Sequence, residues 1–79
     1  WRKSKMFEQL ADLVASELSV SRATITRATH LQDDLGADSL DAVELIMSIE
    51  DKFEVSIPED VASNLKTVGD IMNFLENNL

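Results

Sequence analysis

The spacing of apolar residues along the chain predicts an all-α protein. Apolar residues recur at steps of three or four in three stretches, which is the spacing of one face of an α-helix. These stretches predict helices over residues 4–18, 39–53 and 68–77. Pro58 suits the first position of a short helix over residues 58–64. We therefore expect a small four-helix bundle made of three longer helices and one short helix.

The connections on either side of the second predicted helix lack helical spacing. The long loop before it, residues 19–37, is rich in Ser and Thr, and Thr29 and Gly36 are placed to begin and end a single turn over residues 30–35. A loop of this length is unusual in a compact domain, so we expect apolar side chains to anchor it. Residues 53–57 alternate like a strand but are short and isolated, which favours an extended connection. The anchoring candidates are Val20, Ile25, Leu31 and Leu35.

The second predicted helix carries two apolar strips. At about 100° per residue, one strip forms a narrow arc suited to a core. The other lies about a third of a turn away and is bordered by Glu44 and Asp51. Both strips could be buried in a small bundle, or the second could be a partner-binding face with an apolar centre and an acidic rim. The first strip is Ala42, Leu45, Ile46, Ile49 and Phe53, and the second is Leu40, Val43 and Met47.

Residues 35–41, with the sequence Leu-Gly-Ala-Asp-Ser-Leu-Asp, lead into this helix. Asp38 is placed to cap it, and Asp41 adds a carboxylate where the helix dipole is positive. Gly36 can adopt the positive φ of a turn before the cap. Ser39 then stands at the first helical position with a reachable hydroxyl, at a helix start that can accept an anion. The alternative is a plain helix start.

Charge is distributed unevenly along the 79 residues. Residues 1–30 hold five basic and three acidic residues, net +2, whereas residues 31–79 hold two basic and twelve acidic residues, net −10. An acidic surface repels nucleic acid and anionic membranes and attracts basic protein partners, although it can also serve solubility alone. No apolar run approaches the ~20 residues that span a membrane. We expect a soluble, intracellular protein with no nucleic acid partner and no membrane insertion.

Catalytic and metal-binding motifs are missing from the sequence. The chain has no Cys and one His, His30, which we expect to be an exposed loop residue. A calcium loop starting at Asp33 fails because Leu35 and Ala37 occupy ligand positions. Ser39 lacks the flanking glycines of a hydrolase nucleophile, and no Gly-rich phosphate loop is present. We expect no catalytic residue, no metal site and no enzymatic activity.

Two stretches carry a resemblance to a known family. Residues 35–53 and 55–60, which read LGADSLDAVELIMSIEDKF and VSIPED, resemble the acyl carrier proteins of dissociated fatty acid synthesis. The resemblance covers residues 6–79, which we interpret as one acyl carrier domain. Residues 1–5 are basic and have no counterpart in the family. We expect them to be an extension, a cloning remnant or the remainder of a processed leader.

The resemblance implies a monomeric carrier of growing fatty acyl chains. Ser39 would hold phosphopantetheine, attached as a phosphodiester by a phosphopantetheinyl transferase, with Asp38 and Leu40 beside it. The thiol of this arm would bind the chain as a thioester. The residues that would dock on basic patches of fatty acid synthesis enzymes are Asp38, Leu40, Asp41, Val43, Glu44, Met47, Glu50 and Asp51. The residues that would line an acyl pocket between the second and third helices are Leu45, Ile46, Ile57, Val61, Ala62 and Leu65.

Location and pathway follow from the same resemblance. It implies the cytoplasm, or an organelle interior if residues 1–5 remain from a processed leader. A carrier protein of a polyketide, aminoacyl or D-alanyl pathway would share the bundle and the serine. An unmodified docking subunit would use only the acidic second helix. The context of residues 36–41 and the strongly acidic second helix favour the fatty acid type.

Overall fold

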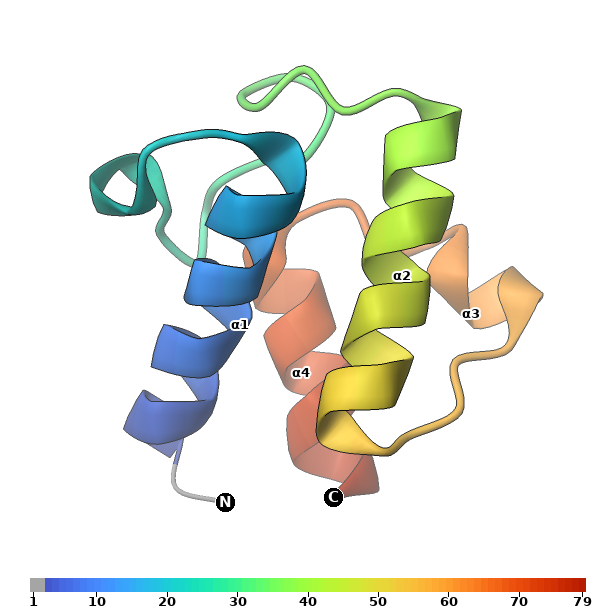
Figure 1. Ribbon diagram of the computed structural model, residues 1–79. Coiled ribbons are helices and arrows are strands. Elements are labelled where there is room, and N and C mark those ends of the chain that lie inside the picture. Colours follow the sequence, from blue (N-terminus) through green and yellow to red (C-terminus); the bar gives the residue numbers. More distant parts are fainter. Residues whose placement is uncertain (1–2) are drawn as a thin grey trace.

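Three longer helices and one short helix surround a single core in the computed structural model, which describes residues 3–79 (Figure 1). α1, α2 and α4 pack together, and the short α3 lies on the side of α2 away from α1. No β-strand occurs in the described residues, so the predicted all-α bundle with a long loop between its first two helices is confirmed. The elements are α1 (Lys3–Leu18), the 3₁₀ helix η1 (Arg22–Thr24), α2 (Ser39–Phe53), α3 (Glu59–Ala62) and α4 (Val68–Asn78).

The helix boundaries differ from the predicted ones at a few positions. α1 begins at Lys3, so three residues of the predicted basic extension form its first turn. Pro58 is the N-cap of α3, with φ −59° and ψ 150°, and the helix ends at Ala62 rather than at residue 64. Residues 31–35 form turns, not a helix. The prediction of a helix over 39–53 is confirmed without change.

The core lies between the inward faces of the long helices. Each helix presents one apolar stripe to it, as the apolar spacing predicts, and complete burial of such a side chain is worth about 1.5–3 kcal/mol. Phe7 of α1 is only half-buried, and the Arg22 guanidinium lies 5.4 Å from the centre of its ring. The largest fully buried side chains are Leu10, Val14, Leu45, Ile49, Val68, Ile71, Met72 and Leu75.

The long loop between α1 and α2 is held by apolar anchors. Ile25, Leu31 and Ala37 are buried in the core, while Val20 and Leu35 are half-buried against it. Four of these five anchors were predicted from the sequence, and Ala37 was not. The loop is therefore irregular over most of its length but is packed against the core at intervals.

The backbone of this loop pairs with the segment that leads into α4. The N–H of Leu31 donates to the C=O of Lys66 at 2.9 Å, and the N–H of Val68 donates to the C=O of Thr29 at 3.0 Å. The N–H of Gly69 also donates to the C=O of Arg27, at 2.7 Å. These bonds satisfy backbone groups that a loop without secondary structure would otherwise leave unpaired.

Gly69 permits the closest of these backbone approaches. A Cβ atom at this position would lie 2.8 Å from the carbonyl oxygen of Arg27, closer than side-chain carbons approach an oxygen atom. Glycine is therefore required for α4 to begin directly against the loop.

Two helices end with a non-glycine residue in the left-handed region. Ser19 after α1 has φ 55°, and Glu54 after α2 has φ 54°. In each case the next N–H reaches back to the helix, from Val20 to the C=O of Ala15 at 3.1 Å and from Val55 to the C=O of Glu50 at 3.2 Å. These bonds close the helix ends at a conformational cost of about 1–2 kcal/mol per residue.

Candidate functional site

Ser39 is the first residue of α2 and is exposed to solvent. Asp38 caps the helix with an extended backbone, and its Oδ1 accepts the N–H of Asp41 at 2.9 Å. In return, the N–H of Asp38 donates to Oδ2 of Asp41 at 3.4 Å, which completes a capping box. Gly36 has φ 70° and turns the chain before the cap. The arrangement holds the Ser39 hydroxyl at a fixed, reachable position.

A cavity of about 520 Å³ begins beside Ser39 and runs between α2, the α3 region and the long loop. The lining is apolar where Ile46, Ile57 and Leu65 contribute and polar where His30, Lys66 and Ser39 contribute. The full lining consists of His30, Leu31, Gln32, Ala37, Ser39, Ala42, Val43, Ile46, Met47, Ile57, Glu59, Ala62, Ser63, Leu65 and Lys66.

Four of the six residues predicted for an acyl pocket line this cavity, namely Ile46, Ile57, Ala62 and Leu65. Leu45 does not, because it is fully buried in the bundle core. Val61 packs against the core and also lies outside the lining. One position of α2 corresponds to about 100°, so Leu45 and Ile46 serve different sides of the helix.

The sequence prediction missed the α1–α2 loop as a cavity wall. His30, Leu31, Gln32 and Ala37 come from this loop, and no helical period marks their direction. Ala42 of α2 was assigned to the core stripe, but it is half-buried and lines the cavity, as Ile46 does. At about 100° per residue Ala42 lies near the middle of the predicted arc, so the apolar spacing gives no sign that it lines the cavity.

The second apolar strip of α2 is exposed. Leu40 retains 65% of its surface accessibility, Val43 55% and Met47 62%. The alternative that both strips are buried is therefore wrong. Val43 and Met47 also line the cavity, so the exposed strip and the cavity share an edge. Adjacent exposed apolar side chains of this size are typical of an interaction surface.

The acidic residues of α2 divide into two groups. Glu44 and Asp51 are exposed beside the apolar strip. Asp41 is engaged in the capping box, and Oε2 of Glu50 accepts the N–H of Ile57 at 2.7 Å. Asp41 and Glu50 therefore have structural partners within the chain, which the sequence prediction of a uniform docking face did not include.

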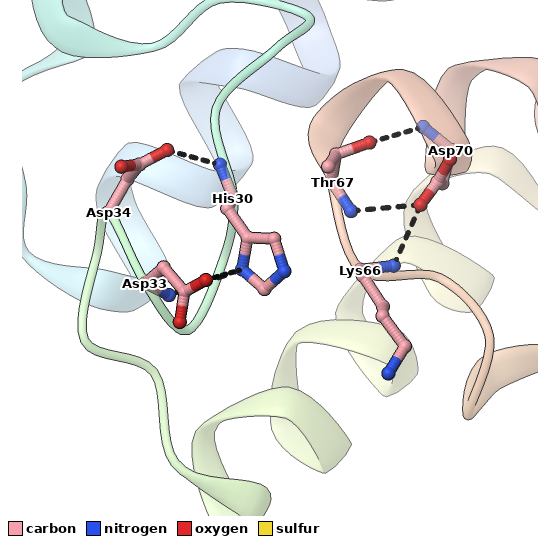
Figure 2. A network of polar contacts seen from close by, with 6 residues as sticks. All are labelled: His30, Asp33, Asp34, Lys66, Thr67 and Asp70. Atoms are coloured by element: carbon pink, nitrogen blue, oxygen red, sulfur yellow. Dashed lines mark hydrogen bonds and ion pairs between the residues drawn. The ribbon is translucent and has the colours of Figure 1, made fainter.

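His30 is half-buried rather than an exposed loop residue. Its Nδ1 accepts the N–H of Asp33 at 3.1 Å. Figure 2 shows the Asp33 carboxylate near the same nitrogen, with Oδ2 at 3.8 Å, and the N–H of His30 donating to Oδ2 of Asp34 at 2.7 Å. His30 thus begins the turn that the sequence assigned to Thr29. Thr29 is instead buried, and its hydroxyl accepts the N–H of Thr26 at 2.8 Å.

Asp70 organises the segment next to His30 (Figure 2). Its Oδ2 accepts the N–H groups of Lys66 and Thr67, both at 3.1 Å, and its N–H donates to the Thr67 hydroxyl. The bond from Lys66 and then that from Thr67 favour the charged carboxylate and hold the pKa of Asp70 below its ordinary value of 3.8. This predicted capping box is present at the start of α4.

Neither a metal centre nor a membrane span is found in the described part of the chain. No three His, Cys, Asp or Glu side chains gather there in a way that could hold a metal ion. Among the same residues, no helix has both the length and the apolar character to cross a membrane.

Comparison with known proteins identifies the family. The family described as "Phosphopantetheine attachment site" matches residues 8–75. The chain is 46% identical to an acyl carrier protein of Porphyromonas gingivalis over 76 residues, covering 96% of this chain and 97% of the relative. It is 47% identical to one of Clostridium perfringens over 70 residues, covering 89% and 92%. A solved structure of a putative acyl carrier protein from Mycobacterium tuberculosis has 38% identity and a TM-score of 0.85, covering 91% and 96%. The chain therefore belongs to the acyl carrier protein family.

Proposed function

We propose that Oγ of Ser39 is the point at which phosphopantetheine is attached, and that this arm carries fatty acyl chains between enzymes. The observation that supports the proposal most strongly is the exposed Ser39 hydroxyl beside an apolar cavity of about 520 Å³. The residues fit the group, because a flexible arm on Ser39 could reach either solvent or the cavity.

The start of α2 suits a phosphodiester. The N–H groups of the first helical residues, Ser39 and Leu40, precede the first intrahelical bond, and the helix dipole favours an anion beside them. Asp38 already directs its Oδ1 to the N–H of Asp41. Attachment would form a bond from Ser39 Oγ, which loses its proton, to the pantetheine-side phosphorus of the coenzyme A pyrophosphate. The bond from that phosphorus to the bridging oxygen would break, and adenosine 3′,5′-bisphosphate would leave. We assign this step to a phosphopantetheinyl transferase.

The arm supplies a terminal thiol that holds an acyl chain as a thioester. Within the chain itself, Ile46, Ile57 and Leu65 offer the apolar surface against which such a chain would be shielded from water. Transfer to an enzyme would require the chain to leave the cavity past Val43 and Met47, which lie on both the cavity and the exposed strip.

The exposed face of α2 is our candidate docking surface. Leu40, Val43 and Met47 would form its apolar centre, and Glu44 and Asp51 its acidic rim. This combination complements an enzyme surface with a basic rim and an apolar centre. Fatty acid synthesis enzymes in the cytoplasm are the expected partners, since the relatives are named as bacterial acyl carrier proteins.

Intact-mass measurement tests the attachment. The protein is incubated with coenzyme A and a phosphopantetheinyl transferase, and its mass is compared before and after. We expect the mass of one phosphopantetheine to be added, and none in Ser39→Ala. Ser63→Ala is the matched control, because Ser63 is another exposed hydroxyl of the same cavity. An unmodified docking subunit would gain no mass in any variant.

A further inference from the structure

We propose that His30 and Lys66 form a hydrogen-bond donor pair at the cavity that binds an anionic oxygen group. Two sources share this chemistry: the phosphodiester of the arm, and a free carboxylate on the acyl group that the arm carries. The proposal rests on the proposed attachment at Ser39 and adds to it which groups this particular cavity accommodates.

The fold brings the two residues to one place from distant parts of the sequence. His30 and Thr67 form an antiparallel bridge, and the N–H of Leu31 donates to the C=O of Lys66 at 2.9 Å. Both the His30 and Lys66 side chains line the cavity that Ser39 also lines. Backbone pairing therefore holds the main chain of His30 and of Lys66 side by side at the same cavity.

The hydrogen bond at Nδ1 determines which edge of the His30 ring is the donor. Because Nδ1 accepts the N–H of Asp33 at 3.1 Å, the proton of the neutral imidazole belongs on Nε2. Figure 2 shows Nε2 on the edge of the ring that faces away from Asp33. The ring of this cavity-lining residue thus has its N–H donor on the edge away from Asp33, while its other edge holds the loop.

Lys66 brings a positively charged side chain to the same cavity. No ion pair to its ammonium is found within 4 Å among the described side chains, and its N–H and C=O are used by Asp70 and Leu31. Its aliphatic stem can cover apolar lining while the ammonium remains at the water-exposed edge. Residues 31–79 have only one other basic residue, Lys52, which is not part of the lining.

Other charges near the cavity restrict where an anion can bind. Glu59 lines the cavity from α3, and Asp33 and Asp34 lie on the loop beside His30. The Asp70 carboxylate also interacts electrostatically with His30, but its Oδ2 already accepts the N–H groups of Lys66 and Thr67. Asp34 directs its carboxylate to the backbone N–H of His30, and Asp33 approaches Nδ1, so neither occupies the Nε2 edge. An oxygen anion is therefore favoured on the side that His30 and Lys66 share.

The test compares three loads on Ser39. A phosphopantetheinyl transferase attaches the arm from coenzyme A, from butyryl-coenzyme A or from succinyl-coenzyme A, and mass spectrometry verifies each load. Side-chain ¹⁵N NMR then follows His30 Nε2 and Lys66 Nζ. If the cargo carboxylate is bound, both signals shift with the succinyl load and not with the butyryl load. If the phosphodiester is bound, both shift already with the unacylated arm.

Variants separate the donor pair from general charge effects. Lys66→Met removes the ammonium, and His30→Asn retains an acceptor for the N–H of Asp33 while removing Nε2. We expect either change to abolish the shift at the remaining partner, and the control Lys52→Met to leave it unchanged. Complete loading without any shift at His30 or Lys66 would overturn this proposal alone. Absence of loading would overturn the attachment at Ser39 as well.

Discussion

The Glu50 carboxylate accepts the N–H of Ile57 at 2.7 Å and thereby ties α2 to the segment before α3. Ile57 is buried and lines the cavity beside Ser39. The same helix therefore both presents the exposed strip and fixes the far wall of the cavity. Glu50, which the sequence places among docking residues, holds this wall from within the chain.

Removal of this carboxylate is expected to weaken the fold. Glu50→Ala leaves the Ile57 N–H without its charged partner, and we predict a loss of about 1.5–3 kcal/mol in the free energy of unfolding. Glu50→Gln keeps an acceptor for the Ile57 N–H, so its free energy of unfolding should fall by less than that of Glu50→Ala. Urea denaturation measures both. Asp51→Ala, at an exposed neighbouring position, is the control and should change stability by about 0.5 kcal/mol or less. Equal effects at the two positions would refute the role of the bond.

Ser19 and Glu54, which have positive φ at the ends of α1 and α2, are positions where substitution by glycine should stabilise the protein. We predict that Ser19→Gly and Glu54→Gly each raise the free energy of unfolding by about 1 kcal/mol, because glycine adopts positive φ without a steric cost. Thermal unfolding followed by circular dichroism gives the measurement. Ser16→Gly, at an exposed position inside α1, should have the opposite sign. A loss of stability at Ser19 or Glu54 would contradict the assigned conformation.

Docking should depend on exposed acidic residues for which no hydrogen bond or ion pair is found among the described residues. We predict that Glu44→Lys or Asp51→Lys slows association with a fatty acid synthesis enzyme several-fold, and that added salt reduces the difference. Asp41→Lys should weaken docking and also destabilise the protein, since it breaks the capping box. Surface plasmon resonance and thermal unfolding separate the two effects. A large drop in melting temperature for Glu44→Lys would contradict the assignment of Glu44 to the exposed acidic residues rather than to those that stabilise the fold.

Protonation of the Asp70 carboxylate at low pH should lower the free energy of unfolding. The pKa of this carboxyl is lower in the folded chain than its ordinary value of 3.8, so the unfolded chain binds the proton more readily. The stabilising contribution is complete above the unfolded pKa and is lost as the pH falls through the folded pKa. We predict that Asp70→Asn, which keeps an acceptor, flattens the fall in melting temperature below about pH 4. Asp51→Asn is the charge-matched control, and an equal flattening there would contradict the prediction.

The sequence predicts the helices well because their apolar faces are local. The steps from Leu10 to Val14 and from Leu45 to Ile49 reveal which residues share a face, and Asp38 with Asp41 marks where α2 begins. Ser39 could therefore be singled out from its neighbours alone. The same spacing predicts which residues of α2 are buried and which are exposed. The exceptions are Ala42 and Ile46, which belong to the predicted core strip but are half-buried and line the cavity.

The residues that these helix faces contact lie far away in the sequence. This accounts for most of the differences between the predicted and the observed cavity lining. The carboxylate of Glu50 accepts the N–H of Ile57 seven positions away, and His30 pairs with Thr67 across the fold. No periodicity connects such residues. The loop wall of the cavity could not be predicted for this reason. Leu45 and Ile46 are both predicted to line the cavity, but only Ile46 does.

The central claim is that Ser39 itself holds the arm, and peptide mapping tests it most directly. After incubation with coenzyme A and a phosphopantetheinyl transferase, the protein is digested and its peptides are fragmented in a mass spectrometer. The account predicts the mass of one phosphopantetheine on the peptide that contains Ser39, localised to that residue. An unmodified Ser39 peptide, or the same added mass on Ser48, Ser63 or any other residue, would contradict the account.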